Sequence, residues 1–427
     1  MKRKHVITIS LIVVCMIASL LLTGCGLLGI GGSSGSHGNQ GGNGQGGNTE
    51  QTRGTVWYDG TEEPNTEELT DAVSGDYYLR VFGDFSGKKG FVIYKLDGDN
   101  WVVLVDMSTE LSEEEQQNVK EYHIRSIQDL TAFADSVNKG NTYANKTVYL
   151  DKDIDLTGVE NWQSIGTKDH YFAGTFNGNG HTISNLTINE PNTNYVGFIG
   201  YLGGGKGAIT NVTFSNATIT GREGCAVAVG CVFNFGTVTD VTVLNSTVKG
   251  LKDIGGIVGE GYVNVSDCTV DGLTATATPR DNDDGDKVGG IVGYLRDSNY
   301  TLSGCTVKNS KLTAYRDLGA LVGCYDGANI LDKVTDNTIE QVTLTIDQTV
   351  DAGSSAMNAR KIVGRTVGYA DADDANDKLA ETNTVTAVTI DYVGVEVDTG
   401  TKPEQPDVDD NQSKDGDEHT DDEQQTD

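Results

Sequence analysis

The sequence predicts an all-β protein whose main body is a parallel β-helix, and three observations support that prediction. A short apolar segment with paired glycines recurs along the chain. Most of its copies lie about thirty residues apart, and between them apolar and polar residues alternate with a period of two. We expect the winding to be right-handed, with a short capping helix and a small antiparallel β module on its N-terminal side.

The first residues form a pattern typical of an export signal, so residues 1–24 are assigned as a signal peptide. Lys2, Arg3 and Lys4 are basic, and residues 6–22 are an almost unbroken apolar run. A permanent transmembrane helix is the alternative. The run is near the short limit for a span, and no basic stop-transfer cluster follows it.

The cleavage site reads Leu22-Thr23-Gly24-Cys25 and resembles the lipobox of bacterial lipoproteins. The resemblance implies that Cys25 becomes the lipidated first residue of the mature chain. We therefore expect a secreted protein that is anchored by its N-terminal lipid to the bacterial cell membrane and faces the exterior.

Two segments have the composition of unstructured chain. Residues 25–54 are dominated by Gly, Asn, Ser and Gln, and we expect them to form a flexible tether. Residues 401–427 are strongly acidic and without aromatic side chains, and we expect a disordered tail. With a formal net charge of −31 the chain repels nucleic acid and anionic lipid. Cations and basic proteins remain possible binding partners. A role in solubility alone would also explain the acidity.

Residues 55–121 predict a small antiparallel β module with a short helix. Strand-length apolar runs cover residues 77–82, 91–96 and 101–105, with turn residues between them. Ser112 followed by three glutamates then predicts a helix start. The sequence of this module contains no recognisable site.

A capping helix is predicted at the start of the repeat domain, which we assign to residues 122–400. Ser126 with Asp129 three residues later indicates a helix start, and Gly140 provides the stop. The apolar residues between them recur at helical spacing, so one face would cover the exposed edge of the first β-helix coil.

The repeat itself is the most informative pattern. Its apolar segments end at Gly200, Gly230, Gly259, Gly293, Gly323 and Gly368, which are separated by 30, 29, 34, 30 and 45 residues. Each apolar segment is followed by two more short β segments. Three strands per repeat predict one coil of a three-sided parallel β-helix.

Stacking of coils predicts columns of equivalent residues. One inward column is Val212, Val241, Cys268, Cys305, Asn337 and Val388, and a second is Phe214, Val243, Val270, Val307, Ile339 and Ile390. A corner follows at Asn216, Asn245, Gly272 and Asn309, residue types that tolerate a left-handed backbone. The cysteines then fill space as small buried side chains, and their number and spacing fit neither a disulfide framework nor a zinc site.

The segments Ile254-Gly-Gly-Ile-Val-Gly259 and Val288-Gly-Gly-Ile-Val-Gly293 resemble the GLUG-motif repeats of bacterial surface proteins. That family builds such repeats into β-helical arrays, often after a helix like the one at residues 127–140. The resemblance covers about residues 122–393. It implies architecture more than activity, since similar repeats occur in adhesins, protease accessory regions and lipoproteins.

We find no catalytic set in the sequence. Lyases and hydrolases on β-helices use paired carboxylates or a basic residue on the outer face of successive coils. Asp240 and Asp267 align, but the next coils offer Gly304 and Asp336. His181 is expected beside a turn without a catalytic partner.

No cofactor or resident metal is predicted. The acidic segments 281–286 and 371–377 could supply oxygen ligands for weak Ca²⁺ binding, but neither has the spacing of an EF-hand loop. We expect solvated loops at β-helix corners.

These patterns favour a surface protein that presents a repetitive β-helix to a polymeric or repeating partner, either a glycan or a protein. A carbohydrate-active enzyme on the same fold is the alternative. An architectural surface protein without a ligand is the third possibility.

Overall fold

The structure is a computed structural model that describes residues 55–60, 63–67, 69–82, 84–279, 285–297, 299–327, 330–349, 363–364, 366–369 and 375–393. The predicted signal peptide, Cys25, the tether and the acidic tail lie outside the described residues. Within the described residues, no helix is both long enough and apolar enough to cross a membrane.

The predicted antiparallel module is confirmed. Strands β2 (Tyr77–Val81), β4 (Phe91–Asp97) and β5 (Asn100–Asp106) pair in antiparallel order, and β1 (Trp57–Gly60) joins β2 in parallel. Strands β3 (Lys88–Lys89) and β6 (Thr109–Glu110) form a separate pair. Tyr78, Val92 and Tyr94 form the small core of the larger sheet.

Two helices follow, each with the predicted cap. Helix α2 (Glu113–Asn118) has a complete capping box between Ser112 and Glu115. Helix α3 (Ile127–Asn138) begins where the Ser126 side chain accepts a hydrogen bond from the backbone N–H of Asp129. The apolar face of α3 is buried in the main core, and Gly140 ends the helix with a φ of +106°.

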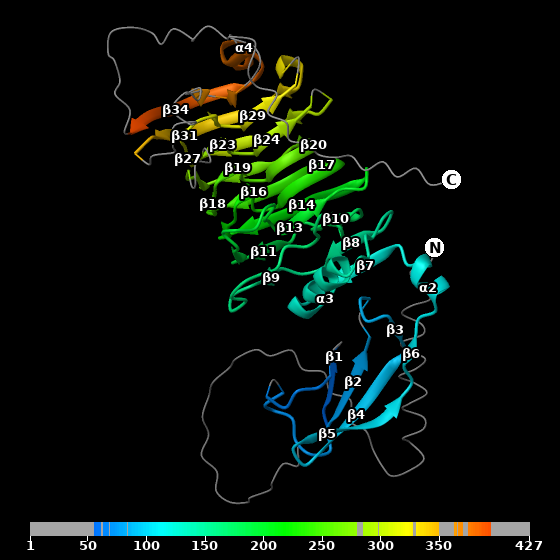
Figure 1. Cartoon of the computed structure of the whole chain (residues 1–427). Coiled ribbons are helices and arrows are strands. Elements are labelled where there is room, and N and C mark those ends of the chain that lie inside the picture. Colours follow the sequence, from blue (N-terminus) through cyan, green and yellow to red (C-terminus); the bar gives the residue numbers. More distant parts are fainter. Residues whose placement is uncertain are drawn as a thin grey trace, which may run out of the picture. The chain divides into compact units, whose positions relative to one another are not determined.

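The main body is a parallel β-solenoid of about seven coils, as the repeat predicted. Figure 1 shows the coils stacked in chain order, from β8 and β9 through β14 and β17 to β31 and β34. Every strand pairs with its equivalent in the next coil, and the buried side chains form one continuous core.

A complete coil has five strand positions, and each position continues along the stack, although the first coils do not fill all five. The first position holds β7 (Glu121–Ile124), β8 (Thr147–Leu150), β10 (Thr175–Asn177), β14 (Gly207–Ser215), β17 (Val229–Leu244), β20 (Val258–Ser266), β25 (Leu302–Ser303) and β30 (Val334–Thr335). The second holds β9 (Ile154–Asp155), β11 (Thr182–Ser184), the ends of β14 and β17, β21 (Thr269–Asp271), β26 (Thr306–Lys308), β31 (Thr338–Asp347) and β34 (Thr384–Val393).

The third position holds β12 (Thr187–Asn189), β15 (Thr218–Thr220), β18 (Thr247–Gly250), β22 (Thr274–Ala277) and β27 (Lys311–Ala314), continued by the ends of β31 and β34.

The fourth position holds β16 (Glu223–Cys225), β19 (Lys252–Gly255), β23 (Asp286–Gly289), β28 (Leu318–Gly319) and β32 (Val363–Gly364). The fifth holds β13 (Ile199–Leu202), the starts of β17 and β20, β24 (Val292–Arg296), β29 (Val322–Asp326) and β33 (Val367–Tyr369). The described residues also include a 3₁₀ helix (Ile330–Asp332) and α4 (Ala375–Thr382).

The prediction of three strands per repeat is wrong, because two of the predicted segments are each divided into two strands. The segment after the glycine-rich one turns a corner, for example at Asp267 between β20 and β21. The glycine-rich segment is two strands with a sharp bend between them. In one coil, β19 ends at Gly255 and β20 begins at Val258. A Cβ at Gly255 would overlap the carbonyl oxygen of Val258, and one at Gly256 would overlap that of Gly290. The paired glycines therefore permit the chain to fold back at this bend.

The inward columns are confirmed except for their last members. Val212, Val241, Cys268, Cys305 and Asn337 follow one another in register. The next residue is Asn383, not Val388, because β34 pairs with β31 from Thr384 onward, and the second column accordingly ends at Val385 instead of Ile390. Two threonines lie five residues apart in each strand, Thr338 and Thr343 in β31 and Thr384 and Thr389 in β34. The sequence pattern is therefore similar whether Thr338 pairs with Thr384 or with Thr389.

The corner residues adopt the backbone conformation that was predicted. Asn216, Asn245, Gly272 and Asn309 have φ values of +56°, +47°, +76° and +50°. The column of Asp240, Asp267, Gly304 and Asp336 is a second corner of the same kind, with φ between +56° and +66°.

Candidate functional site

Three aromatic rings from three successive coils contact one another at one corner of the solenoid, and the bulge that carries the first of them also carries a fourth, exposed ring. We call this group the aromatic edge, and it consists of Phe233 and Phe235 on β17, Tyr262 on β20 and Tyr300 after β24. The ring of Phe235 stacks on that of Tyr300 with centroids 5.7 Å apart, and Tyr262 meets Tyr300 edge-on at 5.9 Å. Phe233 is 53% exposed, whereas Phe235, Tyr262 and Tyr300 are half-buried.

The backbone at the aromatic edge departs from the regular ladder. The pairing of β17 with β20 jumps from Val232 to Gly236, while the partner strand advances only from Gly261 to Val263. The extra residues form a bulge that carries both phenylalanines outward. Asn234 and Phe235 have φ values of +53° and +74°, a conformation that is unfavourable for a bulky side chain. Such strain is concentrated at functional sites.

Hydrogen bonds fix the segment that carries Tyr300. The side-chain oxygen of Asn264 accepts hydrogen bonds from the backbone N–H and the hydroxyl of Thr301, at 3.0 and 3.2 Å. Tyr300 is therefore held against the preceding coil, which makes the platform of rings pre-organised.

A second feature is a stripe of charged side chains that flank the glycine-rich bend. We call it the ion stripe, and it consists of Asp253, Glu260, Asp286, Lys287, Arg296 and Arg316. Lys287 Nζ lies 3.6 Å from Asp253 Oδ1, Arg296 Nη2 lies 2.9 Å from Glu260 Oε2, and Arg316 Nη2 lies 2.8 Å from Asp286 Oδ2. Each of these pairs joins neighbouring coils.

Burial changes the ionisation of the two aspartates in the ion stripe. Burial raises the pKa of Asp253 to about 6, opposed by the positive charge of Lys287 and assisted by the negative charge of Glu260. Burial also raises the pKa of Asp286 to about 7, again opposed by Lys287. Asp286 Oδ1 is buried without a hydrogen-bond partner among the described residues.

The ion stripe does not present its acids to a ligand. The side chains of Asp253, Glu260 and Asp286 are only 3 to 6% exposed, and the cationic side chains cover them. A polysaccharide could not reach Asp253 and Glu260 as a catalytic pair in this geometry. We interpret the stripe as a set of ion pairs that tie the coils together.

Sequence reasoning missed the ion stripe. Three of its members stand immediately before or after the apolar repeat, at Asp253 and Glu260 in one copy and at Lys287 in the next. The sequence signal that could have revealed the stripe is the presence of charged residues on either side of the most apolar segment of a repeat. The prediction that residues 281–286 form a solvated loop is wrong for Asp286, which is buried in β23, while residues 281–284 lie outside the described residues.

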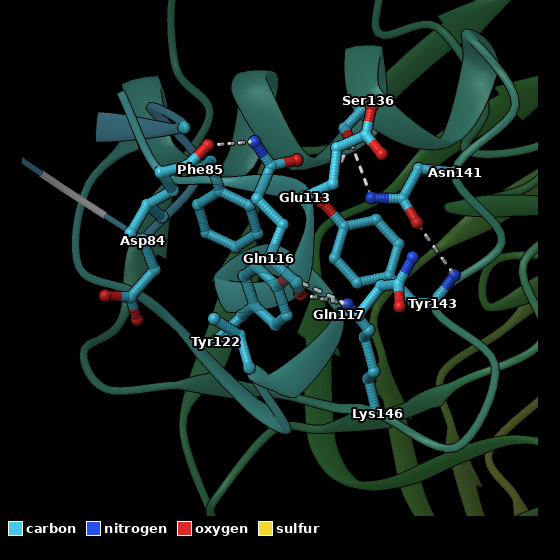
Figure 2. Close-up of a pocket in the computed structure, with 13 residues that line it drawn as sticks. Asp84, Phe85, Glu113, Gln116, Gln117, Tyr122, Ser136, Asn141, Tyr143 and Lys146 are labelled. Atoms are coloured by element: carbon cyan, nitrogen blue, oxygen red, sulfur yellow. Dashed lines mark hydrogen bonds between the residues drawn. The ribbon is translucent and has the colours of Figure 1, made fainter. Parts of the chain in front are cut away.

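An open cleft of about 460 Å³ lies where α2 meets the first coil (Figure 2). Phe85, Tyr122 and Tyr143 form its aromatic part, with ring centroids 5.0 to 6.4 Å apart. Lys146 Nζ donates hydrogen bonds to the backbone oxygen of Gln116 and to the hydroxyl of Tyr122, both at 3.1 Å. These bonds hold α2 against the first coil. We therefore interpret the cleft as a gap in the packing between α2 and the first coil, and not as a ligand site.

The other residues singled out by sequence have structural surroundings. His181 Nδ1 lies 3.1 Å from Asp153 Oδ1 at a corner, and His170 Nδ1 lies 2.8 Å from the backbone oxygen of Asn138. Cys268 and Cys305 are buried in the inward column, as predicted. Residues 371–374 lie outside the described residues, and the prediction of a loop is wrong for residues 375–377, which form the start of α4. Among the described residues, no three His, Cys, Asp or Glu side chains gather as metal ligands.

Comparison with known proteins gives partial similarities. No family model matches the chain. It is 38% identical over 160 residues to halomucin of Haloquadratum walsbyi, covering 36% of this chain and 2% of halomucin. It is 30% identical over 152 residues to a protein of Evansella cellulosilytica provisionally described as a Gly-rich membrane protein, covering 27% of this chain and 17% of that protein. The chain thus spans a small part of both relatives.

One solved structure was also found. It is provisionally described as an immunoglobulin A1 protease from Bacteroides ovatus, with 17% sequence identity and a TM-score of 0.29 over 66% of this chain and 84% of that one. A likeness this distant carries no argument about activity.

Proposed function

We propose that this protein is a cell-surface binding protein whose solenoid holds a neutral polysaccharide against the aromatic edge. The single observation that carries the proposal is the set of contacting, half-buried rings of Phe235, Tyr262 and Tyr300 on three successive coils, with the exposed Phe233 on the same bulge. Aromatic faces pack well against the apolar faces of sugar rings, and they lose little entropy on binding.

The geometry of the stack suits a polymer. Coils repeat about every 4.8 Å along the solenoid axis, so rings on neighbouring coils can contact successive parts of one extended chain. Several weak contacts on one chain add through effective concentration. The net charge of −31 works against anionic polymers, which favours a neutral glycan.

The surface location rests on three supports. The fold is a repetitive β-solenoid, one partial relative is provisionally described as a membrane protein, and Leu22–Cys25 resembles a lipobox. In this proposal Cys25 carries the lipid, and residues 26–54 form a flexible tether that lets the folded domain extend from the membrane. The repeats are those of a GLUG-type surface array.

The test is a binding screen of residues 26–427 against soluble neutral and anionic polysaccharides. Affinity gel electrophoresis reports binding, and a reducing-end assay on the same samples reports cleavage. We expect retention by at least one neutral polymer and no product. Product that accumulates steadily would overturn the binding role in favour of the carbohydrate-active enzyme.

Variants then localise the site. Phe233→Ala and Tyr300→Ala should each weaken retention about tenfold, the effect of losing about 1.4 kcal/mol of aromatic contact. Trp57→Ala is the matched control, because Trp57 is a similarly exposed aromatic residue (45%) on the small sheet. Equal losses in all three variants would argue against the aromatic edge.

A further inference from the structure

Strand β5 is an unusual edge of the small sheet. It is the last strand in the order β1-β2-β4-β5, so among the described residues one side of it has no partner strand. Its side chains Val102, Val103, Leu104 and Val105 are 49%, 55%, 55% and 37% exposed, and Met107 just after it is 60% exposed. Apolar side chains therefore stand in solvent on both faces of an open edge.

Proteins normally protect such an edge. Lysine, proline, an inward charge or a covering loop prevents strand addition. Residues 100–106 read Asn-Trp-Val-Val-Leu-Val-Asp and contain neither lysine nor proline. A bulge at Leu104, itself a feature that discourages strand addition, shifts the pairing with β4, but the four consecutive side chains Val102 to Val105 remain exposed. A contiguous apolar patch of this kind marks an interaction site.

We propose that β5 is a self-association site, where the β5 strand of a second copy of this chain adds in antiparallel orientation. An antiparallel pair centred on Val103 places Val102 opposite Leu104 and Trp101 opposite Val105. Asp106 then faces Asn100, so no acid lies directly opposite another. In a parallel pair, Asp99 and Asp106 would each lie beside their own copies, which is unfavourable.

The pairing buries the apolar side chains on both faces and satisfies the free backbone groups of the edge. The chain is acidic, so repulsion between copies opposes association at low salt. Dimerisation should therefore strengthen as salt is added. The resulting dimer would present two solenoids to one surface.

Sedimentation velocity on residues 26–427 tests the proposal. We expect a concentration-dependent dimer for the unsubstituted chain, and a monomer for Val103→Lys and for Leu104→Lys. Val73→Lys is the matched control, since Val73 is 51% exposed and is not part of β5, and it should remain dimeric. Far-UV circular dichroism shows that each variant is folded. A monomeric unsubstituted chain in high salt, or dimers in both β5 variants, would overturn the proposal.

Cysteine scanning tests the register. Val102→Cys, Val103→Cys, Leu104→Cys and Val105→Cys are oxidised separately, and intermolecular disulfide formation is followed on gels. Val103→Cys should cross-link fastest, because an antiparallel pair places it opposite itself within disulfide reach. Uniformly slow cross-linking would exclude strand pairing. Co-sedimentation of a monomeric chain with phosphatidylcholine vesicles, lost in Val103→Lys, would assign the strand to a membrane and overturn self-association.

Discussion

Lys287 and Asp253 occupy the same position in neighbouring coils, and the ammonium group of one lies 3.6 Å from the carboxylate of the other. Both residues have a left-handed backbone, with φ of +56° and +58°. This conformation turns the two side chains toward the ion stripe instead of into the core. The carboxylate of Asp253 is buried, while Lys287 lies over the ring of Tyr294 at 4.8 Å.

Replacing Lys287 by methionine should destabilise the solenoid. The change leaves the buried carboxylate of Asp253 without its cation, and such changes cost about 3 kcal/mol. Denaturant unfolding at neutral pH measures the loss. Lys249→Met removes an exposed lysine on β18 and should cost about 0.5 kcal/mol or less.

Adding Asp253→Asn to Lys287→Met should recover part of that loss, because the unpaired charge is then gone. If the double variant is as unstable as the sum of the two single variants, the two residues do not interact energetically.

The solenoid should lose stability as pH rises from about 4 to about 7. The pKa values of Asp253 and Asp286 are raised to about 6 and about 7 by burial, whereas the same carboxyls titrate near 4 in the unfolded chain. Between those values the folded chain binds more protons than the unfolded chain, so deprotonation favours unfolding. The free energy of unfolding falls by at most about 1.4 kcal/mol per pH unit for each carboxyl that titrates.

Thermal unfolding across this pH range, with Asp286→Asn beside the unsubstituted chain, measures the effect. Asp286→Asn should flatten the slope. Asp155→Asn should leave it unchanged, because hydrogen bonds from Asn185 and Thr157 lower the pKa of Asp155 to about 2, outside the range. A slope that is the same in all three proteins would assign the pH dependence to other groups.

The parts of the fold that the sequence predicts are those governed by local rules. Period-two alternation specified the inward columns, and the asparagines at positions 216, 245 and 309 specified the corners. Long-range register was harder, because Thr338 pairs with Thr384 across a stretch that includes an insertion. The five-residue threonine spacing gave no way to choose between the two alignments.

The candidate sites depended on contacts that alternation does not encode. The aromatic edge arises from a bulge of residues between Val232 and Gly236, which a period-two pattern treats as an interruption. Among the acids of the ion stripe, Asp286 was predicted to lie in a solvated loop. Burial of these acids by a lysine or arginine of the next coil is visible only after the coils are stacked.

The inward face can be tested with two neighbouring residues. Val270 is fully buried on β21, and Thr269 beside it is half-buried on the opposite face of the strand. Val270→Asp should cost several kcal/mol, because it buries an unpaired carboxylate between Val243 and Val307. Thr269→Asp should cost about 0.5 kcal/mol or less. Denaturant titration that gives similar losses for both would contradict the register.

Lipid attachment can be tested at Cys25, which lies outside the described residues. Leu22-Thr23-Gly24-Cys25 resembles a lipobox, and the thiol at its last position is the group that would be acylated. Cys25→Ala should abolish incorporation of a radiolabelled fatty acid and leave the unprocessed precursor. Cys231→Ala is the matched control, because that thiol is buried in the solenoid and its pKa is raised well above the ordinary value by burial. It should keep full labelling, whereas equal label in the unsubstituted chain and Cys25→Ala would refute the anchor and leave the surface location to be explained by other means.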